Sequence, residues 1–361
     1  MNPYPSCILL NGKSRQVNEL LEMQRNRQAG RPLSGHAAGT SSPSAGWLDF
    51  LAEWYAPGTT ISVQTSGSTG PPKTIRLTKS FVRASALRTL QYFKLHAGDR
   101  VLLALSTRYI AGKLMVVRAL TGELDLHVSD PGGDFALLDR QTFAFAALTP
   151  NQAVKILDGE RGIRRLQQIR QLLLGGSSIP GTLRQRLQNM KTACYSGYAM
   201  TETATHIAIN RINGKEADAW YHCLEAIRVS LSDEGCLRIR MRGLKDPFLQ
   251  TTDRAKLKDE KTFKILGRAD HRIICGGLKY TPEQLEQKLE AELNRPFLIS
   301  SEPHDKLGEQ IVLLVEGKAA SGERSRIRDI CARILDKYER PRQIRFVSSL
   351  PRTPNGKIKR R

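Results

Sequence analysis

The sequence predicts an α/β protein with a large layered α/β domain at its N-terminus and a small α+β domain at its C-terminus. Continuous apolar runs such as 101–105 alternate with helix-like segments, as in sheets whose parallel strands are buried on both faces. Short alternating stretches dominate 227–274, and a strong amphipathic helix with further strands follows Gly277. We therefore expect two domains, 1–269 and 270–361.

The elements follow in order from the hydrophobic pattern. In the first domain the expected strands are 7–12, 60–63, 101–105, 123–128, 143–148 and 170–174, and the expected helices are 16–27, 47–55, 80–93 and 109–120. Thr78 or Ser80 can cap the helix at 80–93. Later strands are expected at 226–231, 236–241, 263–266, 296–300, 310–316 and 343–347, and later helices at 282–293 and 325–335, with Ser325 able to cap the last.

Composition indicates a cytoplasmic globular protein. Apolar residues make up 40% of the 361 and charged residues 25%, which is typical of soluble domains. No apolar run is long enough to span a bilayer, and the first residues lack the basic-then-apolar order of a signal peptide. The six cysteines are scattered without a CxxC pair, so reduced thiols are expected instead of a zinc site or disulfide framework.

The chain is strongly basic. Its 56 Lys and Arg against 35 Asp and Glu give a formal charge of +21, which attracts polyanions. Nucleic acid and small, multiply phosphorylated molecules are both candidates. The charge is spread along the chain, and no basic stripe interleaved with aromatic residues is present. Composition alone leaves nucleic-acid binding open.

A loop at 65–74 has the composition of an anion cradle. It holds Thr65, Ser66, Gly67, Ser68, Thr69, Gly70, Pro71, Pro72, Lys73 and Thr74. Backbone N–H groups and hydroxyls in such a loop can point at one anion, glycines allow close approach, and a lysine adds charge. The glycine spacing is not that of the GxxxxGK[ST] loop. The alternative is a flexible Ser/Gly linker.

Two glycine-containing stretches follow apolar runs. Gly175-Gly176-Ser177 follows such a run and could let a planar ligand lie against the backbone, although an ordinary strand-to-helix turn is the favoured interpretation. In the second stretch, 195–203, Tyr198 could stack on a base and Glu202 could hold Mg²⁺ beside phosphates. A helix start with an acidic first turn explains that stretch equally well.

Three later stretches carry charged groups in distinctive order. Asp253 follows Gln250-Thr251-Thr252, where a solvated turn aspartate is the usual explanation. The stretch 267–286 begins Gly-Arg-Ala-Asp, and Arg268 with Asp270 could be a surface ion pair of little energetic weight. At 351–360 a Thr-Pro-Asn-Gly turn precedes Lys357. A solvated basic tail is the alternative there.

Five of these stretches, all but 175–177, resemble in this order the signatures of the adenylate-forming superfamily, which includes acyl-CoA synthetases, adenylation domains and luciferases. The loop resembles TSGSTGxPKG, with Thr74 in place of glycine, and 195–203 resembles YGxTE, with Ala199 in place of glycine. The match of 249–253 to YxTGD is partial. The stretch 267–286 follows GRxDxxIxxGGxxxxPxxxE closely, and 351–360 follows PRTxxGKIxR. The resemblance covers most of the chain.

The resemblance implies an AMP-binding domain, a small mobile C-terminal lid domain and a role for each matching residue. Lys357, Thr201 and Glu202 would be catalytic, with Glu202 also the magnesium ligand, and Asp270 would be the interdomain hinge. ATP and coenzyme A would be held by Thr65, Ser66, Gly67, Ser68, Thr69, Gly70, Lys73, Gly176, Ser177, Tyr198, Asp253, Arg268, Gly276 and Gly277. The acyl pocket would include Arg108, Tyr109 and Gly197.

Within the superfamily, three features favour a free-standing CoA ligase. No carrier-protein domain follows Lys357, and Tyr109 stands where many members have a gating histidine. The stretch 200–208 resembles the form of this motif in short bacterial o-succinylbenzoate–CoA ligases of menaquinone synthesis. This resemblance implies ATP, Mg²⁺, coenzyme A and a small carboxylate as partners. Only 64 residues precede the loop, so the first domain is expected to be abbreviated.

A second carboxylate on the substrate ring would need a cation, for which Arg108 is the candidate. A surface arginine is the alternative explanation of Arg108. Other aryl- or acyl-CoA ligases and free-standing amino-acid adenylating enzymes remain alternatives, although no acidic partner for an ammonium group is apparent near 108–112. The alternative outside the enzymes is a non-catalytic nucleic-acid-binding protein that has kept the fold of the superfamily.

Overall fold

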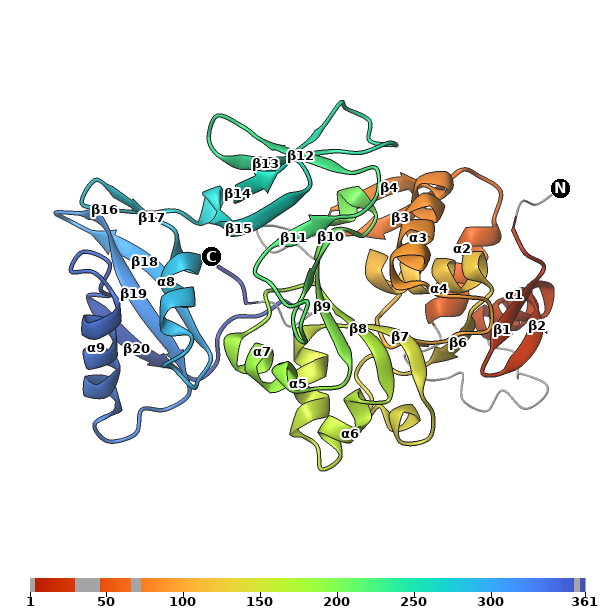
Figure 1. The fold of residues 1–361 in the computed structure, drawn as a ribbon, viewed down its shortest axis with the longest axis horizontal. Coiled ribbons are helices and arrows are strands. Elements are labelled where there is room, and N and C mark those ends of the chain that lie inside the picture. Colours follow the sequence, from red (N-terminus) through yellow and green to blue (C-terminus); the bar gives the residue numbers. More distant parts are fainter. Residues whose placement is uncertain (1–3, 30–45, 66–72, 354–357, 361) are drawn as a thin grey trace. The chain divides into compact units, whose positions relative to one another are not determined.

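The computed structural model describes residues 4–29, 46–65, 73–353 and 358–360. These residues form two compact units (Figure 1): the first holds most of the chain up to Asp218, and the second holds Pro180–Arg186 and Ala219–Arg361. The domain boundary expected at residue 269 stays a prediction. Within the described ranges, no helix combines the length and apolarity needed to cross a membrane.

The first unit is built on a mostly parallel sheet with the strand order β2-β1-β6-β5-β7-β8-β9-β10. Its strands are β1 (Cys7–Leu10), β2 (Lys13–Gln16), β5 (Arg100–Leu103), β6 (Asp125–Val128), β7 (Phe143–Leu148), β8 (Ile169–Leu174), β9 (Ala193–Ala199) and β10 (His206–Arg211). The strands from β1 to β9 in this order run parallel to their neighbours, whereas β2 and β10 are antiparallel. The middle strands consist of the apolar runs that the sequence shows, and the α/β class is confirmed.

The helical connections of this sheet run in two directions. Helix α4 (Ile110–Gly122) joins β5 to β6, while α5 (Pro150–Asp158) and α6 (Gly162–Leu166) join β7 to β8. Since both crossovers are expected to be right-handed, opposite directions place α4 and α5 on opposite faces of the sheet (Figure 1). The strand order therefore reverses between β5 and β7. Ligands of open α/β sheets bind outside the carboxyl ends of the strands at such a point.

The remaining elements of this unit precede β5. They are α1 (Val17–Gln28), α2 (Gly46–Tyr55), the antiparallel pair β3 (Thr60–Gln64) and β4 (Thr74–Thr78), and α3 (Lys79–Phe93). Thr78 caps α3, because its hydroxyl accepts a hydrogen bond of 3.3 Å from the backbone N of Phe81. The expected cap at this helix is thus confirmed for Thr78.

The second unit contains an antiparallel sheet of strand order β12-β13-β14-β15-β11. Its strands are β11 (Tyr221–Cys223), β12 (Arg228–Leu231), β13 (Cys236–Arg240), β14 (Leu249–Asp259) and β15 (Thr262–Arg268). The solvated turn considered for Asp253 is wrong, since this residue lies inside β14 opposite Arg268 of β15. The strand register, and not a turn, places the two side chains together.

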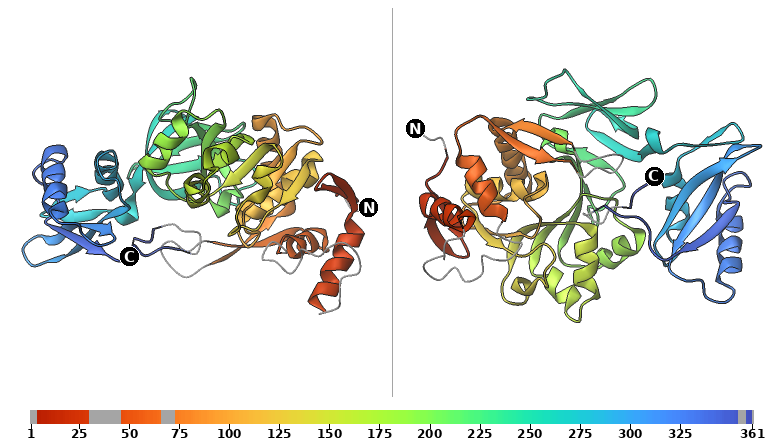
Figure 2. Two further views of the ribbon diagram at one scale, coloured as in Figure 1. Left: turned by 90° about the horizontal axis from the view of Figure 1, so that it is seen from below. Right: turned by 180° about the vertical axis from the view of Figure 1, so that it is seen from behind.

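A smaller sheet follows in the same unit, with two helices on one face (Figure 2, left). It comprises β16 (Ile273–Cys275), β17 (Leu278–Tyr280), β18 (Phe297–His304), β19 (Gly308–Glu316) and β20 (Gln343–Val347), and the helices are α8 (Pro282–Leu289) and α9 (Glu323–Ile334). Leu285 of α8, Ile327 of α9 and Leu313 of β19 share one buried core. Ser325 is not the cap of α9, because the helix begins earlier, after Gly322 with φ 73°.

Candidate functional site

Several predicted site residues lie at one edge of the sheet in the first unit. Parallel pairing places Leu148 beside Leu174, and Leu174 beside Ser196, so β7, β8 and β9 end at the same edge. Arg108 and Tyr109 follow β5, Gly176 and Ser177 follow β8, and Thr201 and Glu202 follow β9. The topology therefore gathers groups that lie far apart in the sequence at the carboxyl edge, where the strand order reverses.

The predicted phosphate loop lies between β3 and β4. Residues 66–72 of the loop, and with them the candidates Ser66 to Gly70, lie outside the described residues. Its two ends are described: the backbone N of Thr65 donates to the carbonyl of Lys73 at 2.9 Å, and the backbone N of Lys73 donates to the Thr65 hydroxyl at 3.0 Å. These bonds extend the β3–β4 ladder by one pair. Strand β4 also contacts η3 (Thr201–Thr203).

The stretch expected to hold a base and a metal forms the end of β9 followed by η3. The alternative of a helix start is thus wrong beyond this single 3₁₀ turn. The hydroxyl of Thr203 donates to the carbonyls of Met200 at 3.1 Å and Thr205 at 2.7 Å, which fixes the turn. Glu202 is exposed at its surface.

Glu202 fits a magnesium site of one particular kind. Among the described residues, no group of three His, Cys, Asp or Glu side chains could hold a metal ion. Mg²⁺ is commonly bound through one or two carboxylates together with substrate phosphates. A single exposed carboxylate in η3, which contacts the strand β4 that follows the predicted phosphate loop, suits that chemistry and not a cage made of protein ligands.

Two glycines at this edge are required by different constraints. Gly176 has φ +88°, and a Cβ there would meet only a methyl of Thr149 at 3.9 Å, so backbone conformation is the constraint. At Gly197 a Cβ would lie 3.2 Å from both His206 and Leu173. Close packing between β9 and its neighbours is therefore the constraint at Gly197.

Arg108, the sequence candidate for a second substrate carboxylate, is exposed. Its backbone N donates to the Ser106 hydroxyl at 3.3 Å. The residue lines a hollow of about 370 Å³ together with Glu53 and Lys113. Lys113 pairs with Glu53 and also donates to the carbonyl of Ser62 at 2.8 Å.

A buried cationic cluster is the feature that sequence reasoning missed. Arg118 of α4 is only 1% exposed. Its Nη2 donates to the Thr205 hydroxyl at 3.2 Å, its guanidinium lies 5.8 Å from the Phe145 ring centre, and its Nε has no partner. No ion pair to Arg118 is formed by any carboxylate in the described ranges. Its signal in the sequence is a lone arginine within the apolar run Val116–Leu120.

The neighbours of Arg118 add to this excess of positive charge. Arg88 of α3 also has a buried Nε without a partner. His206 is buried and lies close enough to both arginines to sense their charge. Burial, then Arg118, then Arg88, hold the pKa of His206 well below its usual value. Burial also lowers the pKa of Arg118 to about 9, as expected for a cation that lacks a counter-ion.

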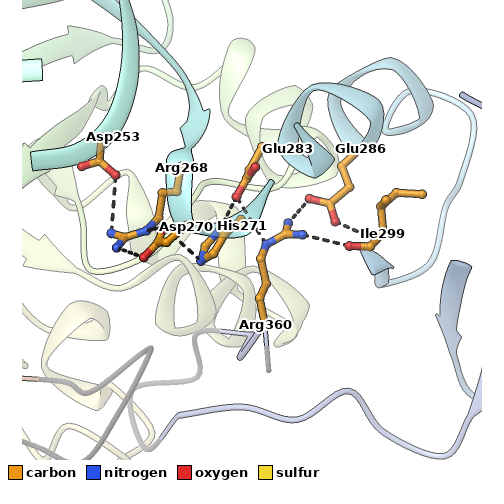
Figure 3. A network of polar contacts seen from close by, with 8 residues as sticks. All are labelled: Asp253, Arg268, Asp270, His271, Glu283, Glu286, Ile299 and Arg360. Atoms are coloured by element: carbon orange, nitrogen blue, oxygen red, sulfur yellow. Dashed lines mark hydrogen bonds and ion pairs between the residues drawn. The ribbon is translucent and has the colours of Figure 1, made fainter. Parts of the chain in front are cut away.

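In the second unit, Arg268 connects two predicted site carboxylates (Figure 3). Its Nε and Nη2 donate to the two oxygens of Asp270 at 2.9 and 2.7 Å, and its Nη1 lies 3.5 Å from Asp253. Burial opposes ionisation of Asp270, but the hydrogen bonds from Arg268 hold the pKa of this carboxyl below its usual value. The geometry is a bidentate pair, the stronger kind of charge-assisted contact.

Two of the remaining candidates of this unit form a hairpin turn. Gly276 and Gly277 join β16 to β17 with φ +58° and +80°, the conformation that two-residue hairpin turns require. Lys357 lies outside the described residues. On either side of it, Arg352 and Ile358 form an antiparallel bridge.

Comparison with known proteins places these features in a family. Residues 28–224 match the AMP-binding enzyme family, and residues 299–357 match the AMP-binding enzyme C-terminal domain. A 2-succinylbenzoate–CoA ligase of Haemophilus influenzae is 28% identical over 73% of this chain and 60% of that protein. The chain thus spans less than two thirds of that relative. A probable 2-succinylbenzoate–CoA ligase of Mycobacterium tuberculosis is 26% identical over 83% of this chain and 82% of its own.

Solved structures are similar over most of the chain. An acyl-CoA synthetase (AMP-forming)/AMP-acid ligase II-like protein from Dyadobacter fermentans is 31% identical, with a TM-score of 0.59 over 86% of this chain and 90% of that one. The o-succinylbenzoate CoA synthetase of Bacillus subtilis, in complex with an acyl-adenylate intermediate, has a TM-score of 0.70. Its identity of 18%, over 94% of this chain and 79% of that one, supports a common fold.

Proposed function

The chain belongs to the AMP-binding enzyme family, and from this premise we propose that it is an AMP-forming carboxylate–CoA ligase whose substrate is o-succinylbenzoate. A substrate carboxylate oxygen attacks the α-phosphorus of ATP, the bond to the β-phosphate oxygen breaks, and pyrophosphate leaves. The coenzyme A sulfur then attacks the acyl carbon of the adenylate, AMP departs, and the thiol proton passes to solvent. The product would be o-succinylbenzoyl-CoA, as menaquinone synthesis requires.

The main predicted site residues have the following roles in this proposal. Lys357 and the loop at 65–74 stabilise negative charge on the transferring phosphoryl group. Glu202 would hold Mg²⁺, which neutralises phosphate charge when bound. Tyr198 faces the adenine, while Asp253 and Arg268 bind the ribose, and Gly276-Gly277 borders the coenzyme A channel. The C-terminal domain is expected to turn about Asp270 between the two half-reactions.

The observation that carries the choice of substrate is the buried Arg118. A charge held away from water without a counter-ion is costly, and no described carboxylate pairs with Arg118. A substrate with a second carboxylate would supply the missing anion, and o-succinylbenzoate has one on its ring. Thr205, the hydroxyl partner of Arg118, follows η3, which carries Glu202. Arg108 remains a prediction for the same role, with weaker support because it is exposed.

A pyrophosphate-release screen tests the activity. The panel pairs o-succinylbenzoate with benzoate, ferulate and aliphatic acids, each with and without coenzyme A. We expect release with o-succinylbenzoate and formation of a thioester only when coenzyme A is present. If another aryl acid is the preferred substrate, the ligase activity is retained but the assignment of o-succinylbenzoate is rejected. Ferulate is in the panel because a feruloyl-CoA synthase of Amycolatopsis is 24% identical over 82% of this chain. If no carboxylate gives pyrophosphate release, the proposed enzymatic activity is refuted.

The matched variants Arg118→Met and Arg108→Ala test the substrate assignment. Losing a charge-assisted hydrogen bond costs about 1.5–3 kcal/mol, so Arg118→Met should raise the Michaelis constant for o-succinylbenzoate about 10- to 100-fold. An analogue without the ring carboxylate should be unaffected. If Arg108→Ala, and not Arg118→Met, raises the Michaelis constant for o-succinylbenzoate alone, the second carboxylate lies at Arg108. Equal loss for both substrates in Arg118→Met would contradict a role in selectivity.

A further inference from the structure

The last described residue of the chain, Arg360, is held by contacts with α8 and β18 of the second unit (Figure 3). We call these contacts the Arg360 clamp. Its side chain is 18% exposed. One guanidinium nitrogen, Nη1, donates to the carbonyl of Ile299 in β18 at 3.0 Å, and Nη2 pairs with Glu286 of α8. The Nε lies 3.5 Å from Glu283 of the same helix. The guanidinium thus contacts a helix and a strand simultaneously.

The two carboxylates of this clamp are themselves fixed. Glu286 accepts a hydrogen bond of 2.7 Å from the backbone N of Ile299. Glu283 accepts one of 2.5 Å from His271, which adjoins the predicted hinge Asp270. Charges at sites this shielded are held only when partners satisfy them. The sequence motif gave no role to Arg360, yet its surroundings are built to hold a guanidinium in one place.

The segment 358–360, which carries Arg360, has further contacts. The backbone N of Lys359 donates to the carbonyl of Pro351 at 2.8 Å, and Ile358 bridges Arg352. On the N-terminal side of residues 354–357, Glu316 accepts from Arg352 and from the backbone N of Leu350, each at 3.0 Å. The chain is therefore fixed on both sides of residues 354–357. Arg360 is the side chain that anchors the C-terminal side.

We propose that Arg360 is a positioning residue for Lys357 and that Glu286 is the group that fixes Arg360. The inference rests on the proposed function, in which Lys357 acts in adenylate formation. Arg360 lies three positions after Lys357, so a shift of the anchored segment is passed to Lys357 through the chain. Without these contacts the segment 358–360 loses its side-chain anchor, and segments with few packing contacts open more readily.

Variants of the clamp should separate the two half-reactions. A displacement of about 1 Å far from the chemistry can cost about 100-fold in rate. We expect Arg360→Ala and Glu286→Gln each to lower carboxylate-dependent pyrophosphate release by about that factor, while thioester formation from supplied acyl-adenylate is retained. Arg360→Lys should recover part of the rate, because the charge remains but the two-pronged geometry is lost.

The control is Arg345→Ala, which removes a bidentate pair between the exposed Arg345 and the half-buried Glu302 elsewhere in the same unit. This variant should leave both half-reactions unchanged. We propose that Arg360 and Glu286 act through the contact between them. The double variant should therefore be no slower than the slower of the two single variants. Additive losses, or equal loss of both half-reactions in the single variants, would overturn the proposal.

A measurement without catalysis distinguishes failure of this inference from failure of the proposed function. Hydrogen exchange at the Lys359 amide, which donates to Pro351, should be faster in Arg360→Ala than in the wild type and in Arg345→Ala. If the wild type releases no pyrophosphate, the proposed function fails whatever the exchange result. Wild-type activity with unchanged exchange and unchanged rates in the clamp variants would reject the positioning role alone.

Discussion

His206 shows how a few buried side chains set a property that can be measured. The imidazole is buried, with its Nδ1 3.2 Å from the Thr205 hydroxyl and its Nε2 3.4 Å from that of Thr89. Burial and the nearby Arg118 and Arg88 place its pKa well below the usual value. The folded protein therefore holds this ring neutral where the unfolded chain would protonate it.

This depressed pKa predicts acid sensitivity of the fold. Above the unfolded-state pKa of about 6.5 the imidazole is neutral in both states, and its full contribution to stability is present. As the pH falls from 6.5 toward the lower pKa of the folded state, the unfolded chain binds the extra proton and stability is lost. The midpoint of thermal unfolding should therefore fall more steeply between pH 6.5 and pH 5 in the wild type than in His206→Gln.

Glutamine is the suitable replacement because it keeps hydrogen-bonding groups near both hydroxyls and does not titrate. Parallel midpoints for wild type and variant across that range would mean that another group causes the acid sensitivity. The same series, repeated with saturating substrate, links this residue to the proposed anion site. A bound carboxylate beside Arg118 would offset the cationic field and reduce the difference between the two proteins.

At the scale of elements, the sequence predicts the apolar parts of the fold well and the polar parts poorly. The runs that became β5, β7 and β8 are continuous and apolar, so burial on both faces identifies them. Strand β9 was not predicted as a strand, because glycine in the middle of a strand is usually unfavourable. In the structure, Gly197 is where β9 packs closely against Leu173 and His206.

The candidate site also contains some residues that the sequence predicts and others that only the structure reveals. Motif order identified the groups at the carboxyl edge of the sheet and the Arg268–Asp270 pair. It gave no role to Arg118 or Arg360, since the partners of each come from distant parts of the chain, such as Thr205 and Glu286. The role of a single arginine can be inferred only when the fold shows which groups surround it. Several loop candidates and Lys357 lie outside the described residues and stay predictions.

The end of β15 supplies a prediction at this scale. Gly267 has φ +139°, and a Cβ there would lie 2.3 Å from a methyl of Thr281 and 2.7 Å from an oxygen of Glu283. Gly267→Ala combines a conformation that alanine disfavours with a steric clash. The conformational part alone costs about 1–3 kcal/mol, so we expect a clearly lower midpoint of thermal unfolding.

A matched variant isolates the clash. Gly235→Ala also has positive φ, at +74°, but its Cβ would meet nothing within 4 Å. It should therefore carry the conformational cost without the steric one. If Gly267→Ala is no less stable than Gly235→Ala, β15 and α8 do not approach each other as closely as the structure shows.

At the scale of the whole molecule, the excess of basic residues has at least two local uses. The +21 charge includes Arg118, held beside His206 and without a carboxylate partner among the described residues, and Arg360, held between two carboxylates. Neither arrangement requires nucleic acid. Under the proposed function Arg118 would attract an anionic substrate, whereas Arg360 pairs with carboxylates of the chain itself.

The proposed function assigns two half-reactions to one chain, which predicts that one can be lost without the other. Lys357 is proposed to stabilise charge during adenylate formation and to have no part in thioester formation. Removal of one preorganised group that stabilises a transition state costs about 100- to 1,000-fold. Lys357→Ala should therefore reduce pyrophosphate release by about that factor and leave the reaction of synthetic acyl-adenylate with coenzyme A near the wild-type rate.

Lys359→Ala is the matched control, because it removes the same charge two residues further along and its side chain is exposed. A general loss of positive charge at the C-terminus would slow both variants equally, whereas a specific catalytic role affects only Lys357→Ala. Comparable loss of both half-reactions in Lys357→Ala would contradict the division of labour. It would mean that the lysine serves a binding step that both reactions share, so that the Michaelis constants for ATP and acyl-adenylate would rise together.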